Sequence, residues 1–228
     1  MMERQKRTQK DWYESPPPLR GQGILQEAGR VHIEQLKRLI PVHKANLSLN
    51  CGCGTGGQDK VFSKSIGMDI SLNNVRSVTA SGGLGVVADV EFLPFKDNTF
   101  DMVYGFGILH HLGNIQKGIS EGARVLKKGG YIGFGAENSG SCPLNYVMCL
   151  IYRNWRIERG FYRIREAFLK KIFREASLSD IKISHHGMTI YGLGRIIYRL
   201  TSTGERWCGR MKLLKPFLGY CYVSGRKE

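Results

Sequence analysis

The stretch from Leu47 to Gly57, LSLNCGCGTGG, constrains the fold more than any other part of the chain. Its first residues alternate between apolar and small polar side chains, as a β-strand does. Four of its last six residues are glycines, which carry no Cβ atom and let the backbone turn sharply. A glycine-rich turn that leaves a parallel strand presents N–H groups at the sheet edge where α/β proteins bind nucleotides. The turn therefore predicts a nucleotide-like ligand, with an ordinary glycine-rich surface turn as the alternative.

The kind of nucleotide is left open by this stretch. Gly52, Gly54 and Gly57 also have the G-x-G-x-x-G spacing of dinucleotide sites, so a dehydrogenase is one alternative. Asp69 follows Gly52 by seventeen residues, at the predicted end of a strand over 65–69. A carboxylate there can accept hydrogen bonds from both hydroxyls of a ribose, in NAD or in an adenosyl ligand. A simpler role for Asp69, near the start of a helix, is the other interpretation.

Strands that alternate with helices predict an α/β fold with right-handed crossovers. We expect a Rossmann-like, doubly wound, seven-stranded and mostly parallel sheet with helices on both faces. A helix over 114–126 should stop at Lys127, Lys128 and the glycines 129 and 130. The polar segment 71–83 should be at most an irregular helix, and the first crossover, 58–65, is short. The other expected helices are 22–39 and 162–176, and the expected strands are 47–51, 65–69, 84–90, 100–105, 131–136, 180–185 and 217–224.

A chain of 228 residues is long enough for one α/β domain, so we expect a single domain over 1–228. Within it we expect an N-terminal segment and helix (1–41), a ligand-binding core (42–136) and a substrate-side part (137–228) with an insertion at 187–215. No apolar run reaches the roughly 18 residues that span a bilayer. The basic N-terminus lacks the apolar stretch of a secretory signal. A cytoplasmic location, with contact to a membrane surface as an option, is the expectation.

Positive charge is concentrated at the end of the chain. The formal net charge is +15, and residues 153–228, with seventeen Lys and Arg against six acids, supply +11 of it. This predicts an anionic partner such as a phosphorylated substrate, a lipid head group or RNA, although basic residues also simply solvate helices. The six cysteines are scattered and predicted to be reduced. Because no second close pair joins Cys51 and Cys53, we predict no metal site.

Four further segments follow the glycine-rich turn in order. They are SIGMDIS (65–71), ADVEFLPF (88–95), FKDNTFDMVYGFGILHHL (95–112) and EGARVLKKGGYIGFG (121–135). With the turn, residues 47–136 resemble the class I S-adenosylmethionine-dependent methyltransferases, particularly the small-molecule branch that includes the ubiquinone and menaquinone C-methyltransferases. The resemblance implies S-adenosylmethionine as cofactor and S-adenosylhomocysteine as product.

The resemblance also implies roles for individual residues. The turn would lie under the cofactor, Asp69 would hold the ribose, and Asp89 would accept the exocyclic amine of adenine. Val90 would offer its backbone N–H to the adenine ring. The family usually has an acid where Asn50 stands, and an amide keeps hydrogen-bonding capacity without the charge. Ile70 and Val90 would sandwich the adenine, and Gly105 and Phe106 would lie at the methionyl end. The full implied set is Asn50, Gly52, Cys53, Gly54, Gly56, Asp69, Ile70, Asp89, Val90, Gly105 and Phe106.

His110 and His111 are the candidates for a general base, which is needed only if the acceptor must lose a proton. Packing at a helix start is the other interpretation, and His185 and His186 rank lower. Aromatic residues interleaved with arginines in 10–25, 138–165 and 187–215 favour a small acceptor that is apolar, lipid-like or anionic. No RNA-binding module is recognisable, so a tRNA methyltransferase ranks second; a non-catalytic cofactor-binding protein is the third alternative. The aromatics are Trp12, Tyr13, Tyr146, Tyr152, Trp155, Tyr191 and Trp207.

Overall fold

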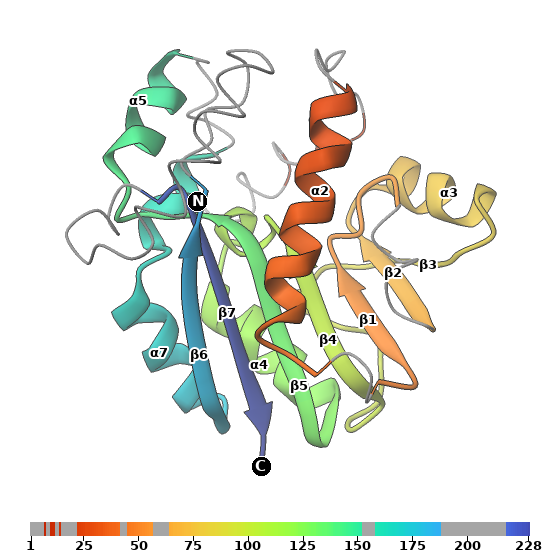
Figure 1. Ribbon diagram of the computed structural model, residues 1–228. Coiled ribbons are helices and arrows are strands. Elements are labelled where there is room, and N and C mark those ends of the chain that lie inside the picture. Colours follow the sequence, from red (N-terminus) through yellow and green to blue (C-terminus); the bar gives the residue numbers. More distant parts are fainter. Residues whose placement is uncertain are drawn as a thin grey trace.

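The computed structural model describes residues 7, 10, 11, 14, 22–41, 45–56, 64–151, 158–187 and 218–228. Seven strands form one sheet in the order β3-β2-β1-β4-β5-β7-β6 (Figure 1). Neighbours from β3 to β5 are parallel, and β7 is antiparallel to both β5 and β6. The predicted seven-stranded, mostly parallel sheet is confirmed. The strands are β1 (Ser48–Cys51), β2 (Ser65–Asp69), β3 (Leu84–Val87), β4 (Phe100–Phe106), β5 (Leu126–Asn138), β6 (Leu178–His186) and β7 (Tyr220–Lys227).

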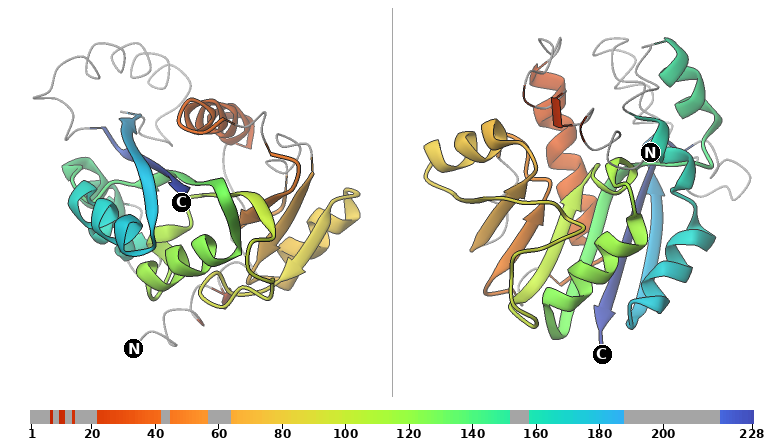
Figure 2. Two further views of the ribbon diagram at one scale, coloured as in Figure 1. Left: turned by 90° about the horizontal axis from the view of Figure 1, so that it is seen from below. Right: turned by 180° about the vertical axis from the view of Figure 1, so that it is seen from behind.

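Helices cover both faces of the sheet, as predicted. Figure 2, left, shows α2 (Gln22–Lys37) on one face and α3 (Leu72–Ala80), α4 (Ile115–Val125) and α7 (Glu166–Glu175) on the other. Helix α5 (Pro143–Ile151), which the sequence analysis does not predict, lies beyond the top of the sheet in Figure 1. Two 3₁₀ turns, η3 (Leu109–His111) and η4 (Arg159–Arg163), complete the described elements. No helix in these ranges is long and apolar enough to span a membrane.

The core is divided by the sheet, because successive side chains of a strand point to opposite faces. Met102 and Tyr104 of β4 pack with Leu36 and Ile40 on the α2 side. Val103, between them, belongs to the larger cluster on the side of α4 and α7. The two clusters hold the central strands between the helix layers, and this fixes where the strand ends lie.

Two local expectations are wrong. Glycines 129 and 130 do not stop α4: the helix ends at Val125, and β5 begins at the next residue. A Cβ on Gly130 would lie 2.8 Å from the carbonyl oxygen of Asp101, so glycine is needed there for the close approach of β5 to β4. Lys127 does not cap a helix either; its Nζ contacts a carboxylate oxygen of Asp101 at 2.8 Å.

The segment 71–83 forms a regular helix rather than an irregular one. The Ser71 hydroxyl accepts a hydrogen bond from the N–H of Asn74 and caps the first turn of α3. The glycines at 82 and 83 follow the helix end and do not interrupt it. The strand that follows is shorter than predicted and ends at Val87. Most of the expected crossover 58–65 and of the insertion 187–215 lies outside the described residues.

Candidate active site

A cavity of about 330 Å³ lies at the carboxyl ends of β1, β2 and β4. Strand order reverses at this place, because β1 has β2 on one side and β4 on the other; α/β sheets bind ligands at such a point. Four segments form its walls: the glycine-rich turn, the end of β2, the loop after β3 and the segment after β4. Of the predicted site residues, the cavity is lined by Gly52, Cys53, Gly54, Gly56, Asp69, Ile70, Asp89, Val90, Phe106 and His111, and not by Asn50, Gly105 or His110.

The glycine-rich turn is held against β2. The N–H groups of Gly52 and Cys53 both donate to the carbonyl oxygen of Met68, at 2.8 and 3.0 Å. Gly52 has φ +71° and Gly54 has φ +55°, conformations that favour glycine. A Cβ on Gly52 would also lie 2.9 Å from the Ile108 side chain. The turn therefore needs its glycines both for its conformation and for contact with the segment after β4.

Asp69 joins two parts of the cavity wall. One carboxylate oxygen accepts the N–H of Gly54 and the other accepts the N–H of Ser71, each at 2.9 Å. The residue is only 8% exposed. A carboxylate has about four acceptor positions, so these two bonds leave room for a ligand hydroxyl. Asp69 thus does stabilise the start of α3, and its ribose role stays a prediction.

The loop after β3 is fixed by two more carboxylates. Asp89 accepts the N–H of Glu91 at 2.9 Å, and Glu91 in turn accepts the N–H of Asn114 at 3.0 Å. Asn114 is the N-cap of α4, so the loop is tied to that helix. Val90 is buried in the larger core cluster while it also lines the cavity. This loop forms a defined wall at the place where the adenine is expected.

Asn50 and Gly105 lie in the sheet behind the cavity wall. Asn50 is fully buried in β1, beside Gly67 and Tyr104 of the neighbouring strands. A Cβ on Gly105 would lie 2.6 Å from the carbonyl oxygen of Cys51, so packing between β1 and β4 already requires glycine. The structure does not bring these two residues to the cavity, and their cofactor roles stay predictions.

The two candidate bases have different surroundings. His111 lines the cavity, whereas the ring of His110 lies between two carboxylates: Nδ1 is 2.7 Å from Glu137 and Nε2 is 3.1 Å from Glu158. Burial alone would lower the pKa of His110, but these two acids raise it well above its usual value. A protonated imidazole cannot accept a proton, so His111 is the better candidate for a base. His185 lies elsewhere, paired with Glu166 at 2.9 Å.

Glu137 is a site residue that the sequence analysis missed. Its fully buried carboxylate accepts the N–H groups of Ile108, Leu109 and His110, at 2.9, 2.9 and 3.2 Å. It thereby positions η3 at the end of β4. The signal was present in the sequence, because Glu137 directly follows the predicted strand 131–136, much as Asp69 ends the predicted strand 65–69. Glu158 had no such signal, since it lies forty-seven residues beyond His111.

The expected acceptor side is only partly described. Of the aromatic residues predicted to line it, Tyr146 is described: its hydroxyl donates to the carbonyl oxygen of Gly140 at 3.1 Å, and its ring packs edge-on against Phe161. The other six lie outside the described residues. The prediction of an aromatic acceptor pocket therefore stays a prediction.

Comparison with known proteins gives a family. Residues 49–134 match the model of the methyltransferase domain family. Among curated proteins, an uncharacterized protein of Methanocaldococcus jannaschii is 40% identical over 92 residues, 40% of this chain and 36% of that protein. Human mitochondrial arginine-hydroxylase NDUFAF5 is 34% identical over 58% of this chain and 41% of its own length. Human probable tRNA methyltransferase 9B is 30% identical over 60% of this chain and 29% of its own length. The chain thus spans less than half the length of these relatives.

Solved structures share the fold over nearly the whole chain. A SAM-dependent methyltransferase of Thermotoga maritima has a TM-score of 0.65 at 18% identity, covering 100% of this chain and 98% of that one. Geranyl diphosphate C-methyltransferase of Streptomyces coelicolor has a TM-score of 0.63 at 13% identity, covering 98% of both chains; that structure contains S-adenosylhomocysteine. Residues 49–134 thus match the methyltransferase domain family, and the chain shares its fold with solved S-adenosylmethionine-dependent methyltransferases.

Proposed function

We propose that this protein transfers a methyl group from S-adenosylmethionine to a small acceptor that is apolar or anionic, and releases S-adenosylhomocysteine. The observation that carries the proposal is the cavity at the point where strand order reverses. Its wall combines the glycine-rich turn with two carboxylates, Asp69 at the end of β2 and Asp89 in the loop after β3, inside a matched methyltransferase domain.

The residues of this chain fit an adenosyl sulfonium ligand. Asp69 keeps acceptor positions for ribose hydroxyls, because its two bonds use only part of its capacity. The Asp89 carboxylate lines the same cavity and is of the type that accepts an exocyclic amine. The sulfonium supplies a good leaving group, so the protein's main task is to place an acceptor atom in line with the methyl carbon. Such placement is worth about 7 to 11 kcal/mol.

His111 would act only on acceptors that must lose a proton. It is buried and lines the cavity on the wall formed by the segment after β4. Glu137 determines where it lies, because that carboxylate holds the backbone of η3. General-base catalysis of this kind contributes about 10²- to 10⁴-fold. An acceptor that is already a free amine or thiolate needs no such help.

Ligand binding is the first test of this proposal. S-adenosylhomocysteine at 100 times its Kd should stabilise the folded protein by about 2.7 kcal/mol, which is visible as a shift in thermal unfolding, and NAD should give none. Methyl-labelled cofactor should then be offered with small-molecule and RNA fractions of a cell extract. Label in the small-molecule fraction supports the proposal, and a shift with NAD alone would overturn it in favour of a dehydrogenase.

A tRNA methyltransferase is the second candidate. It is favoured by the relative named probable tRNA methyltransferase 9B and by the positive charge of residues 153–228. It predicts RNase-sensitive label in the RNA fraction, and retention of tRNA that weakens steeply with salt. Binding of S-adenosylhomocysteine with no transfer to either fraction would instead favour a non-catalytic cofactor-binding protein.

We also propose a cytoplasmic location with peripheral contact to an anionic membrane surface. The same surplus of Lys and Arg supports this, because basic segments are attracted to anionic lipids. Sedimentation with vesicles containing phosphatidylserine, compared with purely zwitterionic vesicles, tests the contact. Equal sedimentation with the two kinds of vesicle would contradict the proposed membrane contact.

A further inference from the structure

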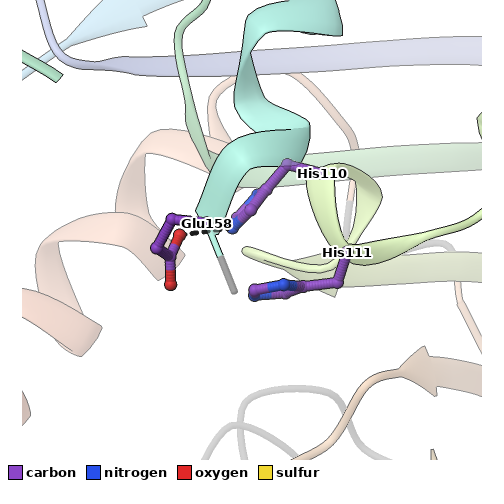
Figure 3. Close-up of side chains that lie close together, drawn as sticks. All are labelled: His110, His111 and Glu158. Atoms are coloured by element: carbon purple, nitrogen blue, oxygen red, sulfur yellow. Dashed lines mark ion pairs between the residues drawn. The ribbon is translucent and has the colours of Figure 1, made fainter. Parts of the chain in front are cut away.

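Three potential metal ligands converge beside the cavity. His110 and His111 belong to η3, and Glu158 immediately precedes η4. Their ligand atoms all lie within 4.8 Å of one another. Figure 3 shows the two imidazole rings extending in the same direction, with the carboxyl group of Glu158 at their ends. We propose that His110, His111 and Glu158 bind a divalent transition-metal ion.

The distance between two of the three ligands suits an ion directly, and the third ligand lies close to them. Nitrogen and oxygen ligands lie about 2.0 to 2.2 Å from Zn²⁺, so two ligands at angles of about 90 to 110° are roughly 2.8 to 3.6 Å apart. His110 Nε2 and the nearer oxygen of Glu158 are 3.1 Å apart. The rings of His110 and His111 are tilted by 44°, with centroids 4.1 Å apart, so both can present a nitrogen to one point. An ion between His110 Nε2 and Glu158 would take the place of a proton on that nitrogen.

The surroundings orient these ligands in the way that metal sites require. A metal-binding histidine usually donates its other ring N–H to a carboxylate, which fixes its tautomer. Glu137 is such a carboxylate, 2.7 Å from Nδ1 of His110, and it is fully buried. Asn138 likewise donates its side-chain amide to Glu158 at 3.0 Å. Two neighbouring residues at the end of β5 therefore orient these two ligands.

Charge favours the same conclusion. Glu137 and Glu158 bring two carboxylates to one largely buried place, and a divalent ion would balance both. Arg163 of η4 is close, but its guanidinium donates to the carbonyl oxygens of Leu112 and Gly113, at 2.6 and 3.0 Å. Its hydrogen bonds thus hold the backbone after η3 and do not engage these carboxylates.

The ligand set indicates which ion and what it could do. Two imidazoles and one carboxylate are typical of catalytic zinc sites and of non-haem iron(II) sites, which keep coordination positions open. His111 also lines the cavity, so the open positions would face the bound substrate. There the ion could hold and polarise an oxygen of the acceptor and make its proton easier to lose. With the ion bound, this would replace the base role of His111, because a coordinated imidazole nitrogen cannot accept a proton. That last step rests on the proposed function, whereas ion binding does not.

The test measures metal binding without donor or acceptor. Tag-free full-length protein is stripped with a chelator and titrated with Zn²⁺ by calorimetry, and with Co²⁺ by visible absorption. One equivalent should bind, and Co²⁺ should give the d–d bands of a site with nitrogen and oxygen ligands. Glu158→Gln and His111→Asn should each weaken Zn²⁺ binding by at least about 100-fold, more than the loss of an outer-shell partner.

Glu166→Gln is the matched control. It removes the acid from another His–Glu pair, His185 and Glu166, whose ring nitrogen and carboxylate oxygen are 2.9 Å apart. It should bind Zn²⁺ as the wild type does. Absence of one-to-one binding in the wild type, or equal affinity in all variants, would overturn the metal site. Near-ultraviolet circular dichroism and affinity for S-adenosylhomocysteine confirm that each variant is folded. A wild type that binds S-adenosylhomocysteine but not Zn²⁺ refutes only the metal site.

Discussion

Replacing Asp69 by asparagine tests the candidate site most directly. In the structure one oxygen of Asp69 accepts the N–H of Gly54 and the other accepts that of Ser71. An asparagine has one acceptor oxygen and one NH₂ donor, so it can keep only one of these bonds. Losing a hydrogen bond to a charged group costs about 1.5 to 3 kcal/mol. For a chain of this size that corresponds to a fall in Tm of about 3 to 12 °C.

The same change should weaken ligand binding. If Asp69 also accepts the ribose hydroxyls, the loss of a charge-assisted bond of about 1.5 to 3 kcal/mol raises the Kd for S-adenosylhomocysteine by roughly 10- to 150-fold. Isothermal titration calorimetry measures the affinity, and urea unfolding measures the stability. Asp180→Asn is the control, because the same chemical change on an exposed residue of β6 should alter stability by less than about 0.5 kcal/mol.

The result that refutes this reasoning is a folded Asp69→Asn protein with wild-type affinity. A fall in Tm together with unchanged affinity would mean that Asp69 only holds the glycine-rich turn to α3. Loss of affinity with unchanged stability would mean that its two backbone bonds contribute little.

Three further predictions concern the sheet and its surroundings. Gly105→Ala should destabilise the fold by about 1 to 3 kcal/mol in urea unfolding, because its Cβ would lie 2.6 Å from the carbonyl oxygen of Cys51; wild-type stability would contradict this. Leu36→Ala should cost about 2 to 5 kcal/mol and leave the Kd for S-adenosylhomocysteine unchanged, since the fully buried Leu36 packs on the α2 side. Hydrogen bonds from Arg124 lower the pKa of Glu121, so this pair should contribute stability that is present above about pH 4.5 and is lost as the pH falls further. Between pH 7 and pH 3 the urea midpoint of unfolding should fall less for Glu121→Gln than for the wild type. Equal falls in the midpoint would contradict a stabilising role for the Glu121–Arg124 pair.

Local sequence patterns predict the centre of this fold well. Alternation and glycines locate β1 and the turn after it, and the strand predicted at 65–69 is β2. These patterns succeed because a buried parallel strand needs a short apolar run and the turn needs residues that tolerate positive φ. They fail at glycines 129 and 130. Glycine is needed at 130 because the backbone of β4 comes too close for a side chain, and no local pattern contains such a contact between strands.

Some residues of the candidate site could be predicted from the sequence, and others could not. The residues of the glycine-rich turn and Asp69 were predicted because they lie where strands end, and Asp89 was predicted from the family resemblance. Glu158 could not be predicted from the sequence, because its position beside His110 depends on how η4 packs against η3. His110 was predicted as a base together with His111, and its buried position between two carboxylates could not be predicted from local sequence.

The sequence alone thus determined the α/β class, the glycine-rich turn and the position of Asp69, because each of these follows from short-range spacing, while the family resemblance implied the other predicted residues of the cavity wall. Only the tertiary structure decided which side chains face the cavity and which face one another behind it. The physical reason is that burial and charge pairing depend on neighbours distant in the chain: His111 lines the cavity, whereas His110, one residue away, lies between Glu137 and Glu158.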